Sequence, residues 1–169
     1  IIQINSLPIR SLCPNISIWP QHIAAVLNRS KTVEENVIEI RSELVVEEQR
    51  MHFLPHYFGA RYLHGEAFVY DWARRLCSTY NGGMWHFFRL SNGAFYLAPE
   101  IAAPVSVRWN LNSYEGSMGA EAFGIVVTLY ALCHMAETFG DERFIDHYHA
   151  LRAFAVQHPE QREIFRAID

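Results

Sequence analysis

Residues 72–99 read WARRLCSTYNGGMWHFFRLSNGAFYLAP, and this stretch decides the fold of the chain. It contains the end of a helical segment, a Gly82-Gly83 break, and two aromatic-rich segments separated by Asn92-Gly93. Asn-Gly is a strong hairpin signal, because a two-residue type I′ turn needs positive φ at both central positions. The stretch therefore predicts a helix followed by a β-hairpin.

A two-residue loop at Asn92-Gly93 also predicts the register of this hairpin. The expected cross-strand pairs are Leu90 with Phe95, Arg89 with Tyr96, and Phe88 with Leu97. Because strand side chains alternate with a period of two, Arg89 and Tyr96 then share the face opposite to the apolar one. Trp85 belongs to the same outward face, which the pattern predicts to be exposed.

The remaining chain supplies further helices and a third strand. The other predicted elements are a short helix at 47–53 halted by Pro55, a helix at 61–80, a strand at 105–109, a long apolar helix from an N-cap at Ser117 to Phe139-Gly140, a helix capped by Asp141, and a final helix at 159–168. Within the helix at 61–80, Asp71 and Arg75 are spaced to pair at i,i+4. The predicted fold class is α+β, a small antiparallel sheet of about three strands packed with four or more helices.

The length predicts one folded domain with an accessory N-terminal segment. A chain of 169 residues, 50% of them apolar, can bury a single core and does not need two. Residues 1–40 contain three prolines and only fragmentary periodicity, with possible short elements at 20–29 and 33–46. We therefore expect an accessory segment at 1–40 and the functional domain at 41–169.

The charge distribution argues against DNA binding and against DNA mimicry. The formal net charge is −4, and Lys31 is the only lysine, so the basic face of a nucleic-acid-binding protein is missing. The acidic residues occur at most in pairs, such as Glu47-Glu48, whereas a protein that mimics DNA needs dense rows of carboxylates. The sequence predicts neither stable nucleic-acid binding nor DNA mimicry.

Cysteine usage and hydropathy indicate a soluble cytoplasmic protein. Cys13, Cys77 and Cys133 are odd in number, far apart, and lack C-x-x-C spacing, so they predict neither a disulfide framework nor a zinc ribbon. Such usage favours a reducing compartment. The chain shows no secretory signal, and no apolar run reaches the roughly 18 residues that a membrane span needs.

Motifs for catalysis and cofactor binding are weak or missing in this sequence. His134, Glu137 and Asp141 follow one another by about one helical turn, and a metal-dependent enzyme using these three residues is the alternative function. However, the chain has no H-E-x-x-H, no G-x-S-x-G and no phosphate-binding loop. The sequence predicts no catalytic residue, cofactor or metal ligand.

The aromatic and arginine content around the hairpin favours a binding module over an enzyme. Tyr, Trp and Arg side chains concentrate binding energy in protein interfaces. The predicted partner-binding patch consists of Arg74, Arg75, Trp85, Arg89 and Tyr96.

A series of short motifs, in order along the chain, supports a family resemblance. They are Glu48-Gln49-Arg50, Pro55-His56-Tyr57-Phe58-Gly59, Phe68-Val69-Tyr70-Asp71-Trp72, Arg75-Leu76-Cys77, Tyr80-Asn81-Gly82-Gly83-Met84-Trp85, Leu90-Ser91-Asn92-Gly93, Phe95-Tyr96-Leu97-Ala98-Pro99, Glu121-Ala122-Phe123-Gly124, His147-Tyr148 and His158-Pro159. With them, the run from 47 to 169 resembles the ArdB/KlcA antirestriction proteins of plasmids and other mobile elements.

The resemblance implies a fold outside the common superfolds and a role in blocking Type I DNA restriction, so that incoming DNA survives in a new host. It attaches no catalytic residues to the family, and it implies as partner the host Type I restriction enzyme or an associated host protein. The chain departs from the shorter family members in its N-terminal extension and at 101–115.

Overall fold

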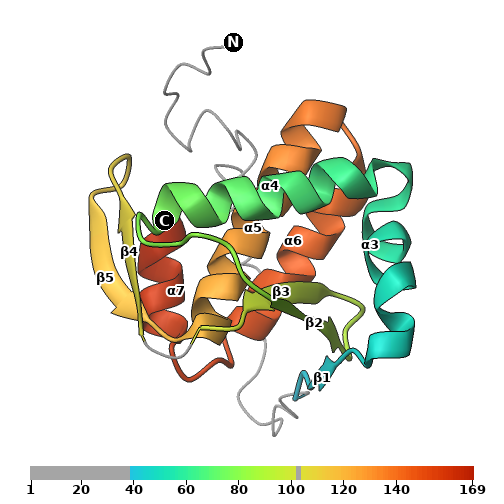
Figure 1. Cartoon of the computed structure of the whole chain (residues 1–169), viewed down its shortest axis with the longest axis horizontal. Helices are drawn as coiled ribbons and strands as arrows, with labels where there is room; N and C mark the ends of the chain where they lie inside the picture. The colour runs from blue at the N-terminus through green and yellow to red at the C-terminus, as the bar shows by residue number, and fades with distance from the viewer. Residues whose placement is uncertain (1–38, 102–103) are drawn as a thin grey trace, which may run out of the picture. The chain divides into compact units, whose positions relative to one another are not determined.

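The computed structural model describes residues 39–101 and 104–169 of the chain. The helices are α3 (Arg50–Phe58), α4 (Tyr62–Leu76), α5 (Ala120–Phe139), α6 (Glu142–Ala155) and α7 (Gln161–Ile168), and the strands are β1 (Ser42–Leu44), β2 (Trp85–Leu90), β3 (Phe95–Pro99), β4 (Val105–Trp109) and β5 (Tyr114–Met118) (Figure 1). These elements confirm the predicted α+β class. The predictions made for residues 1–38, including the possible helix at 20–29, lie outside the described residues.

The strands form two small antiparallel sheets instead of the single sheet expected. One sheet has the order β1-β2-β3, and the other contains only β4 and β5. The expectation that 105–109 joins the hairpin is therefore wrong. The chain turns back sharply after β4, where Asn112 Oδ1 accepts a hydrogen bond of 3.0 Å from Tyr114 N and Ser113 has a φ of 59°. Because of this turn, β4 pairs with its sequence neighbour β5.

The predicted register of the β2-β3 hairpin is wrong by one residue. Phe88 pairs with Tyr96, and Leu90 N donates a 2.9 Å hydrogen bond to Ala94 O, so the loop has three residues, 91–93. Only Gly93 among the loop residues has positive φ, at 85°, as expected for a type I turn followed by a left-handed glycine. A one-residue slip moves each side chain to the other face, so Arg89 and Tyr96 lie on opposite faces of the sheet.

Helix α5 covers the free edge of β3. Leu97 N, which has no strand partner on that side, donates a 3.1 Å hydrogen bond to Thr128 Oγ1. Gly124 allows the close approach, because a Cβ at this position would overlap Leu97 O and lie 2.6 Å from the Ala98 Cα. All five β3 residues are buried as a result. The helix thus protects an edge that would otherwise be open to another strand.

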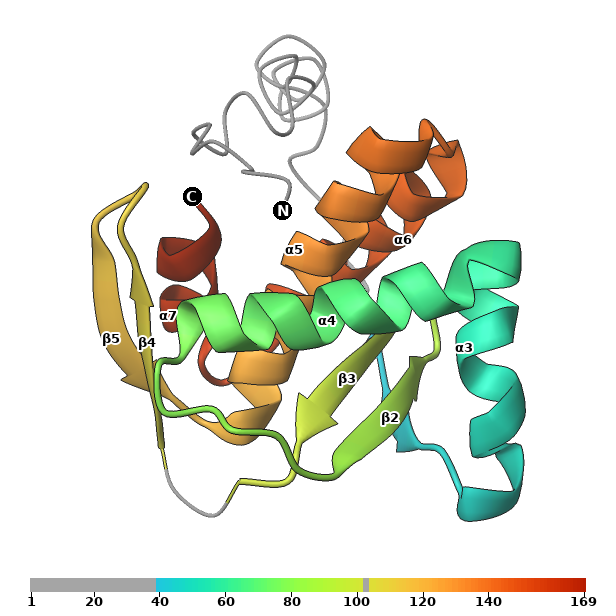
Figure 2. The same cartoon turned by 45° about the horizontal axis from the view of Figure 1, so that its top comes forward.

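The apolar character of α5 reflects its place in the core. By length and composition alone it is the one helix of the described residues that could cross a membrane, but 67% of its apolar window is buried inside the protein. Figure 2 shows α5 behind α4 and beside α6. Its end is as the sequence predicts, because Gly140 adopts the left-handed conformation and its N–H donates to Ala136 O at 2.9 Å.

Several predicted helix boundaries are wrong. Helix α3 continues through Pro55 to Phe58, because Phe53, Tyr57 and Phe58 are all buried and their packing outweighs the loss of one backbone hydrogen bond. Ser117 lies in β5, and Gly119 is the residue that precedes α5. The last helix begins at Gln161, two residues after Pro159.

Two cysteines lie in the described part of the chain. Cys77 is a free, buried thiol. Cys133 lies in α5, within the apolar helical segment that the sequence indicated.

His147 on α6 should titrate below its ordinary range. Its ring centroid lies 5.5 Å from those of both Tyr57 and Phe95, and burial is the main cause that lowers its pKa below 6.5. As pH falls, the imidazole of His147 is therefore protonated more readily in the unfolded chain than in the folded one. Its contribution to the free energy of unfolding becomes unfavourable to the fold as pH falls below 6.5. We expect an NMR titration of His147 to give a pKa below 6.5.

Comparison with His147→Gln isolates this contribution to stability. The difference in free energy of unfolding, wild type minus variant, should decrease as pH is lowered from 7.5 to 5 in urea titrations. A difference that does not change with pH would contradict the burial of this imidazole.

Candidate functional site

The five residues of the predicted partner-binding patch do not form one surface. Trp85 is only 3% exposed, and its Nε1 donates a 2.7 Å hydrogen bond to the Tyr80 hydroxyl. Its ring also packs near Tyr70, with 5.6 Å between centroids. The predicted exposure of Trp85 is wrong, because the segment before β2 and helix α4 cover this end of the sheet.

Tyr96 is fully buried, so its predicted exposure is also wrong. Its ring stacks on Phe88 at 4.6 Å and on Phe154 of α6 at 5.7 Å. Its hydroxyl donates a 2.6 Å hydrogen bond to Glu121 Oε1 and lies 2.8 Å from Ser42 Oγ. Burial is the main cause that raises the pKa of the phenol. Tyr96 therefore joins β1, β3 and α5 inside the fold.

Removing the hydroxyl of Tyr96 should weaken this junction without disturbing the core. Tyr96→Phe keeps the stacked ring but loses both hydrogen bonds, and we expect the free energy of unfolding to fall by about 1 kcal/mol. Urea titration measures the change. Tyr62→Phe is the matched control, because Tyr62 is 37% exposed and its replacement should have little effect. Equal effects of the two variants would contradict the role assigned to the Tyr96 hydroxyl.

Arg89 lies on the other face of the sheet, next to α3. It is half-buried, and its guanidinium donates a 2.7 Å hydrogen bond to Gln49 Oε1. Burial raises the pKa of the neighbouring Tyr57 phenol, and the charge of Arg89 partly offsets this rise. Arg89 is thus engaged within the fold and separated from Tyr96 by the sheet.

The two arginines near the end of α4 have different surroundings, although both are exposed. Arg74 forms a 2.9 Å ion pair with Asp71 Oδ1, so the pair predicted between Asp71 and Arg75 is wrong. Arg75 instead places its guanidinium carbon 5.2 Å from the centroid of the Trp72 ring. Within residues 39–101 and 104–169, Arg75 has no carboxylate partner.

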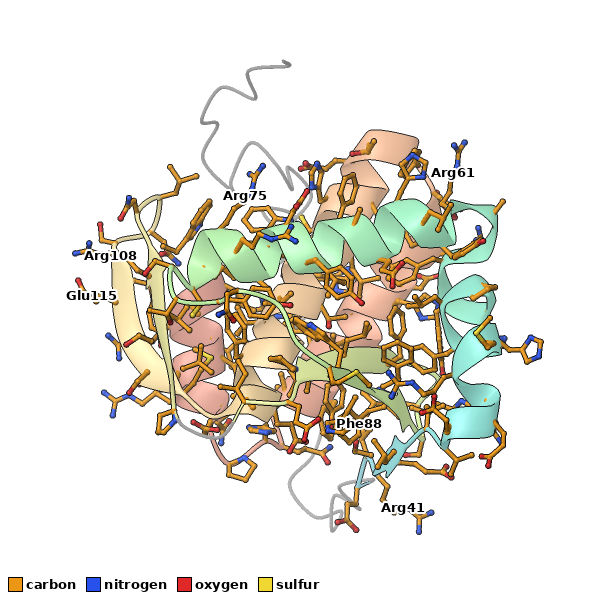
Figure 3. All side chains as sticks on the ribbon, in the orientation of Figure 1. Arg41, Arg61, Arg75, Phe88, Arg108 and Glu115 are labelled. Atoms are coloured by element: carbon orange, nitrogen blue, oxygen red, sulfur yellow. The ribbon has the colours of Figure 1, made fainter. Side chains whose placement is uncertain are left out.

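A cleft of about 350 Å³ lies beside Arg75, between the end of α4 and strands β4 and β5; we call it the α4/β4 cleft. Its lining residues are Arg75, Leu76, Ser78, Ser106, Val107, Arg108, Trp109, Asn110, Glu115 and Gly116. Figure 3 shows Arg75 toward the end of α4 nearest the hairpin formed by β4 and β5, with Arg108 and Glu115 together on that hairpin. Across the hairpin, Arg108 and Glu115 form an ion pair of 3.0 Å.

Contacts between aromatic rings hold this end of α4 against α5 and β4. The Trp72 ring lies 4.5 Å from Tyr130 of α5 and 5.3 Å from Trp109 of β4. The indole nitrogens of Trp72 and Trp109 are buried without a hydrogen-bond partner in the described structure. These rings fix the position of the cleft wall relative to Arg75.

Two of the three candidate metal ligands have other roles, and burial raises the pKa of the third, Glu137, to about 7. His134 stacks on Phe68, with 3.8 Å between ring centroids, and burial is the main cause that lowers its pKa. Asp141 caps α6 by accepting from Arg143 N, and it also forms a 2.7 Å ion pair with the Arg143 side chain. Among the residues that the structure describes, no group of three or more His, Cys, Asp and Glu side chains could hold a metal ion.

Comparison with known proteins identifies the family. A family model for antirestriction proteins matches residues 78–169. The antirestriction protein KlcA of Escherichia coli is 48% identical over 135 residues, which is 77% of this chain and 95% of that protein. The chain belongs to the antirestriction protein family. A further relative, the uncharacterized protein YafX of Escherichia coli strain K12, is 42% identical and matches 74% of the chain and 85% of its own length.

A solved antirestriction structure has the same fold. It comes from work reporting that the KlcA and ArdB proteins have a novel fold and act against Type I DNA restriction systems in vivo but not in vitro. The match has a TM-score of 0.73 at 46% identity and covers 83% of this chain and all of the other. These findings confirm the family resemblance seen in the sequence motifs.

The sequence pattern missed the α4/β4 cleft of this antirestriction protein. Ser106, Arg108 and Asn110 alternate with the buried side of β4, so they were identifiable as one exposed face. Their proximity to Arg75 was not predictable, because 30 or more residues separate the two sides of the cleft. The family match begins at Ser78 and so includes the β4 and β5 side but not Arg75.

Proposed function

We propose that this protein counteracts Type I DNA restriction in the cell through contact with a host protein, without catalysing a reaction and without imitating DNA. The observation that carries the proposal is the match to KlcA along nearly its whole length. The partner is the Type I restriction enzyme or an associated host protein. Activity of the solved relatives in vivo but not in vitro supports a requirement for a component present only in cells.

The arrangement of acidic residues supports a mechanism other than DNA mimicry. Many carboxylates lie beside an arginine. The ion pairs include Glu47 with Arg50, Asp71 with Arg74, Glu115 with Arg108, Asp141 with Arg143, Glu163 with Arg166, and Asp169 with Arg152. A surface of alternating sign differs from the uniform negative charge of a DNA duplex. Contact with a protein fits such a surface better.

We assign this activity to residues 41–169 and regard 1–40 as an accessory segment. The compact unit that begins at Ile40, and the alignment of KlcA with 77% of the chain, support this division. We place the protein in the cytoplasm, where it would meet the restriction enzyme.

Plating of unmodified phage tests the proposed function. The protein is expressed in a host with a Type I restriction system, in an isogenic host without one, and in a host with a Type II system. We expect plating on the Type I host to rise toward the level of the unrestricted host, with no change on the Type II host. Failure to protect despite soluble expression would refute the proposal.

The dependence of protection on dose distinguishes contact from catalysis. A contact mechanism needs copies of the protein comparable in number to its target, whereas an enzyme acts at a small fraction of that number. We therefore expect protection to saturate only when the protein, measured by quantitative immunoblot, reaches an abundance comparable to that of its target, the restriction enzyme or the associated host protein. Full protection far below that level would contradict a contact mechanism and favour a catalytic one.

A further inference from the structure

The α4/β4 cleft combines an arginine that lacks an acidic partner with several polar side chains. Within the part of the chain that the structure describes, Arg75 is the one charged lining residue outside an ion pair, since Arg108 and Glu115 pair with each other. We propose that this cleft binds an acidic side chain, Asp or Glu, on a segment of the partner protein. The inference rests on the proposed function and assigns it a contact surface.

Arg75 is positioned to receive a carboxylate. Its guanidinium lies over the Trp72 ring, a contact that restricts the side chain while leaving its N–H groups free to donate. A guanidinium can donate two parallel hydrogen bonds to one carboxylate, which gives geometric selectivity as well as attraction. Arg74 does not line the cleft, and its guanidinium contacts Asp71 on α4.

The opposite wall of the cleft can add donors to the same ligand. The ion pair of Arg108 and Glu115 has side chains 69% and 72% exposed, so it contributes little stability and can exchange partners. A carboxylate in the cleft would compete with Glu115 for Arg108. Ser78 and Ser106 supply hydroxyl groups at the same opening.

The charges of the cleft favour an acidic protein segment over a nucleic acid. Two arginines and one glutamate give the cleft a net charge of +1 within a protein of net charge −4. One carboxylate is enough to neutralise this charge, whereas a DNA backbone needs a row of cations along its phosphates. The volume of about 350 Å³ accommodates side chains of a short peptide segment.

Three single substitutions test the proposal, each removing one charge at an exposed position. Arg75→Gln removes the free cation, and Glu115→Gln removes the competitor for Arg108. Arg74→Gln is the matched control, because it makes the same charge change one residue away and outside the cleft lining. Equal urea midpoints for the four proteins would show that they are equally folded.

The probe is an acetylated and amidated tetraglutamate peptide, titrated into the full-length protein and followed by ¹H–¹⁵N NMR. We expect shifts at the amides of Ser78, Ser106 and Gly116. The dissociation constant should rise about two- to fivefold in Arg75→Gln, fall by a similar factor in Glu115→Gln, and stay unchanged in Arg74→Gln. No shift at these amides, or equal effects of Arg74→Gln and Arg75→Gln, would overturn the proposal.

Two parallel titrations test whether inorganic phosphate or DNA binds the same cleft more tightly than the peptide. Sodium phosphate or a 20-base-pair duplex that shifts the same amides at a lower concentration than the peptide would overturn the assignment to an acidic protein segment. Weaker effects of both anions would support it.

Phage plating separates this inference from the proposed function. Loss of protection in Arg75→Gln, with protection retained in Arg74→Gln, would support the cleft as the contact surface. Full protection by an Arg75→Gln protein whose peptide binding is weakened as expected would overturn the cleft as the contact surface and leave the proposed function intact. Absence of protection by the wild type would refute the proposed function instead.

Discussion

Replacement of Gly124 by alanine is expected to lower the free energy of unfolding by about 3 kcal/mol, at the upper end of the range for overpacked cores. A Cβ at this position would overlap Leu97 O and lie 2.6 Å from the Ala98 Cα. Both are backbone atoms of β3, which cannot rotate away as a side chain could. Helix α5 would therefore have to move from the strand edge, weakening the hydrogen bond from Leu97 N to Thr128 Oγ1.

The expected loss of stability in Gly124→Ala is opposite in sign to the usual effect of this substitution in a helix. Glycine to alanine in an unconstrained helix stabilises it by up to about 1 kcal/mol, so a loss of stability can come only from the packing. Urea titration followed by circular dichroism gives the change. Gly82→Ala serves as a control, because no atom lies within 4 Å of its added Cβ and only its φ of +104° opposes the change. An unchanged or increased stability of Gly124→Ala would refute the close contact between α5 and β3.

Replacement of Phe95 by alanine is expected to cost about 3–5 kcal/mol, because it removes the ring at the centre of the aromatic core. Phe95 is fully buried, and its ring centroid lies 4.2 Å from Tyr57, 5.2 Å from Phe58 and 5.7 Å from Phe53. It also contacts His147 of α6. The cavity left by this ring would loosen α3, α6 and the sheet together, and such a loss approaches the total stability of many small domains.

Thermal unfolding and urea titration both measure this loss. Met51→Ala is the matched control on α3, because Met51 is 83% exposed and its truncation should change stability by less than about 0.5 kcal/mol. Phe95→Leu should retain much of the lost stability, since leucine refills part of the cavity. A Phe95→Ala protein as stable as Met51→Ala would show that this ring is not central to the core.

Local sequence patterns correctly predicted those helix ends that are determined by residues next to them in the chain. The helix that ends at Gly140 and the cap by Asp141 follow from a left-handed glycine and from a carboxylate that accepts a backbone N–H. The two hairpin strands were also predicted, because alternation and a turn signal are both short-range features. The α+β class follows from the order of these elements.

Predictions that depended on one turn type or on long-range packing were less accurate. A single additional loop residue, Ser91, reversed the assignment of faces and placed Tyr96 in the core. The burial of β3 on both faces and its edge depends on α3, α5 and α6, none of which is adjacent to it in the sequence. The exposure of Trp85 and Tyr96 could not be inferred from alternation alone.

The sequence by itself was enough to argue against DNA mimicry from its composition and to predict the helical and hairpin segments. Its ordered motifs also identified the family. Only the tertiary structure decided which side chains are accessible and which distant ones meet. Residue spacing specifies contacts over one or two turns. The burial of Tyr96 arises instead from the packing of α5 and α6 against β3, and the cleft between Arg75 and Arg108 arises from the packing of α4 against β4.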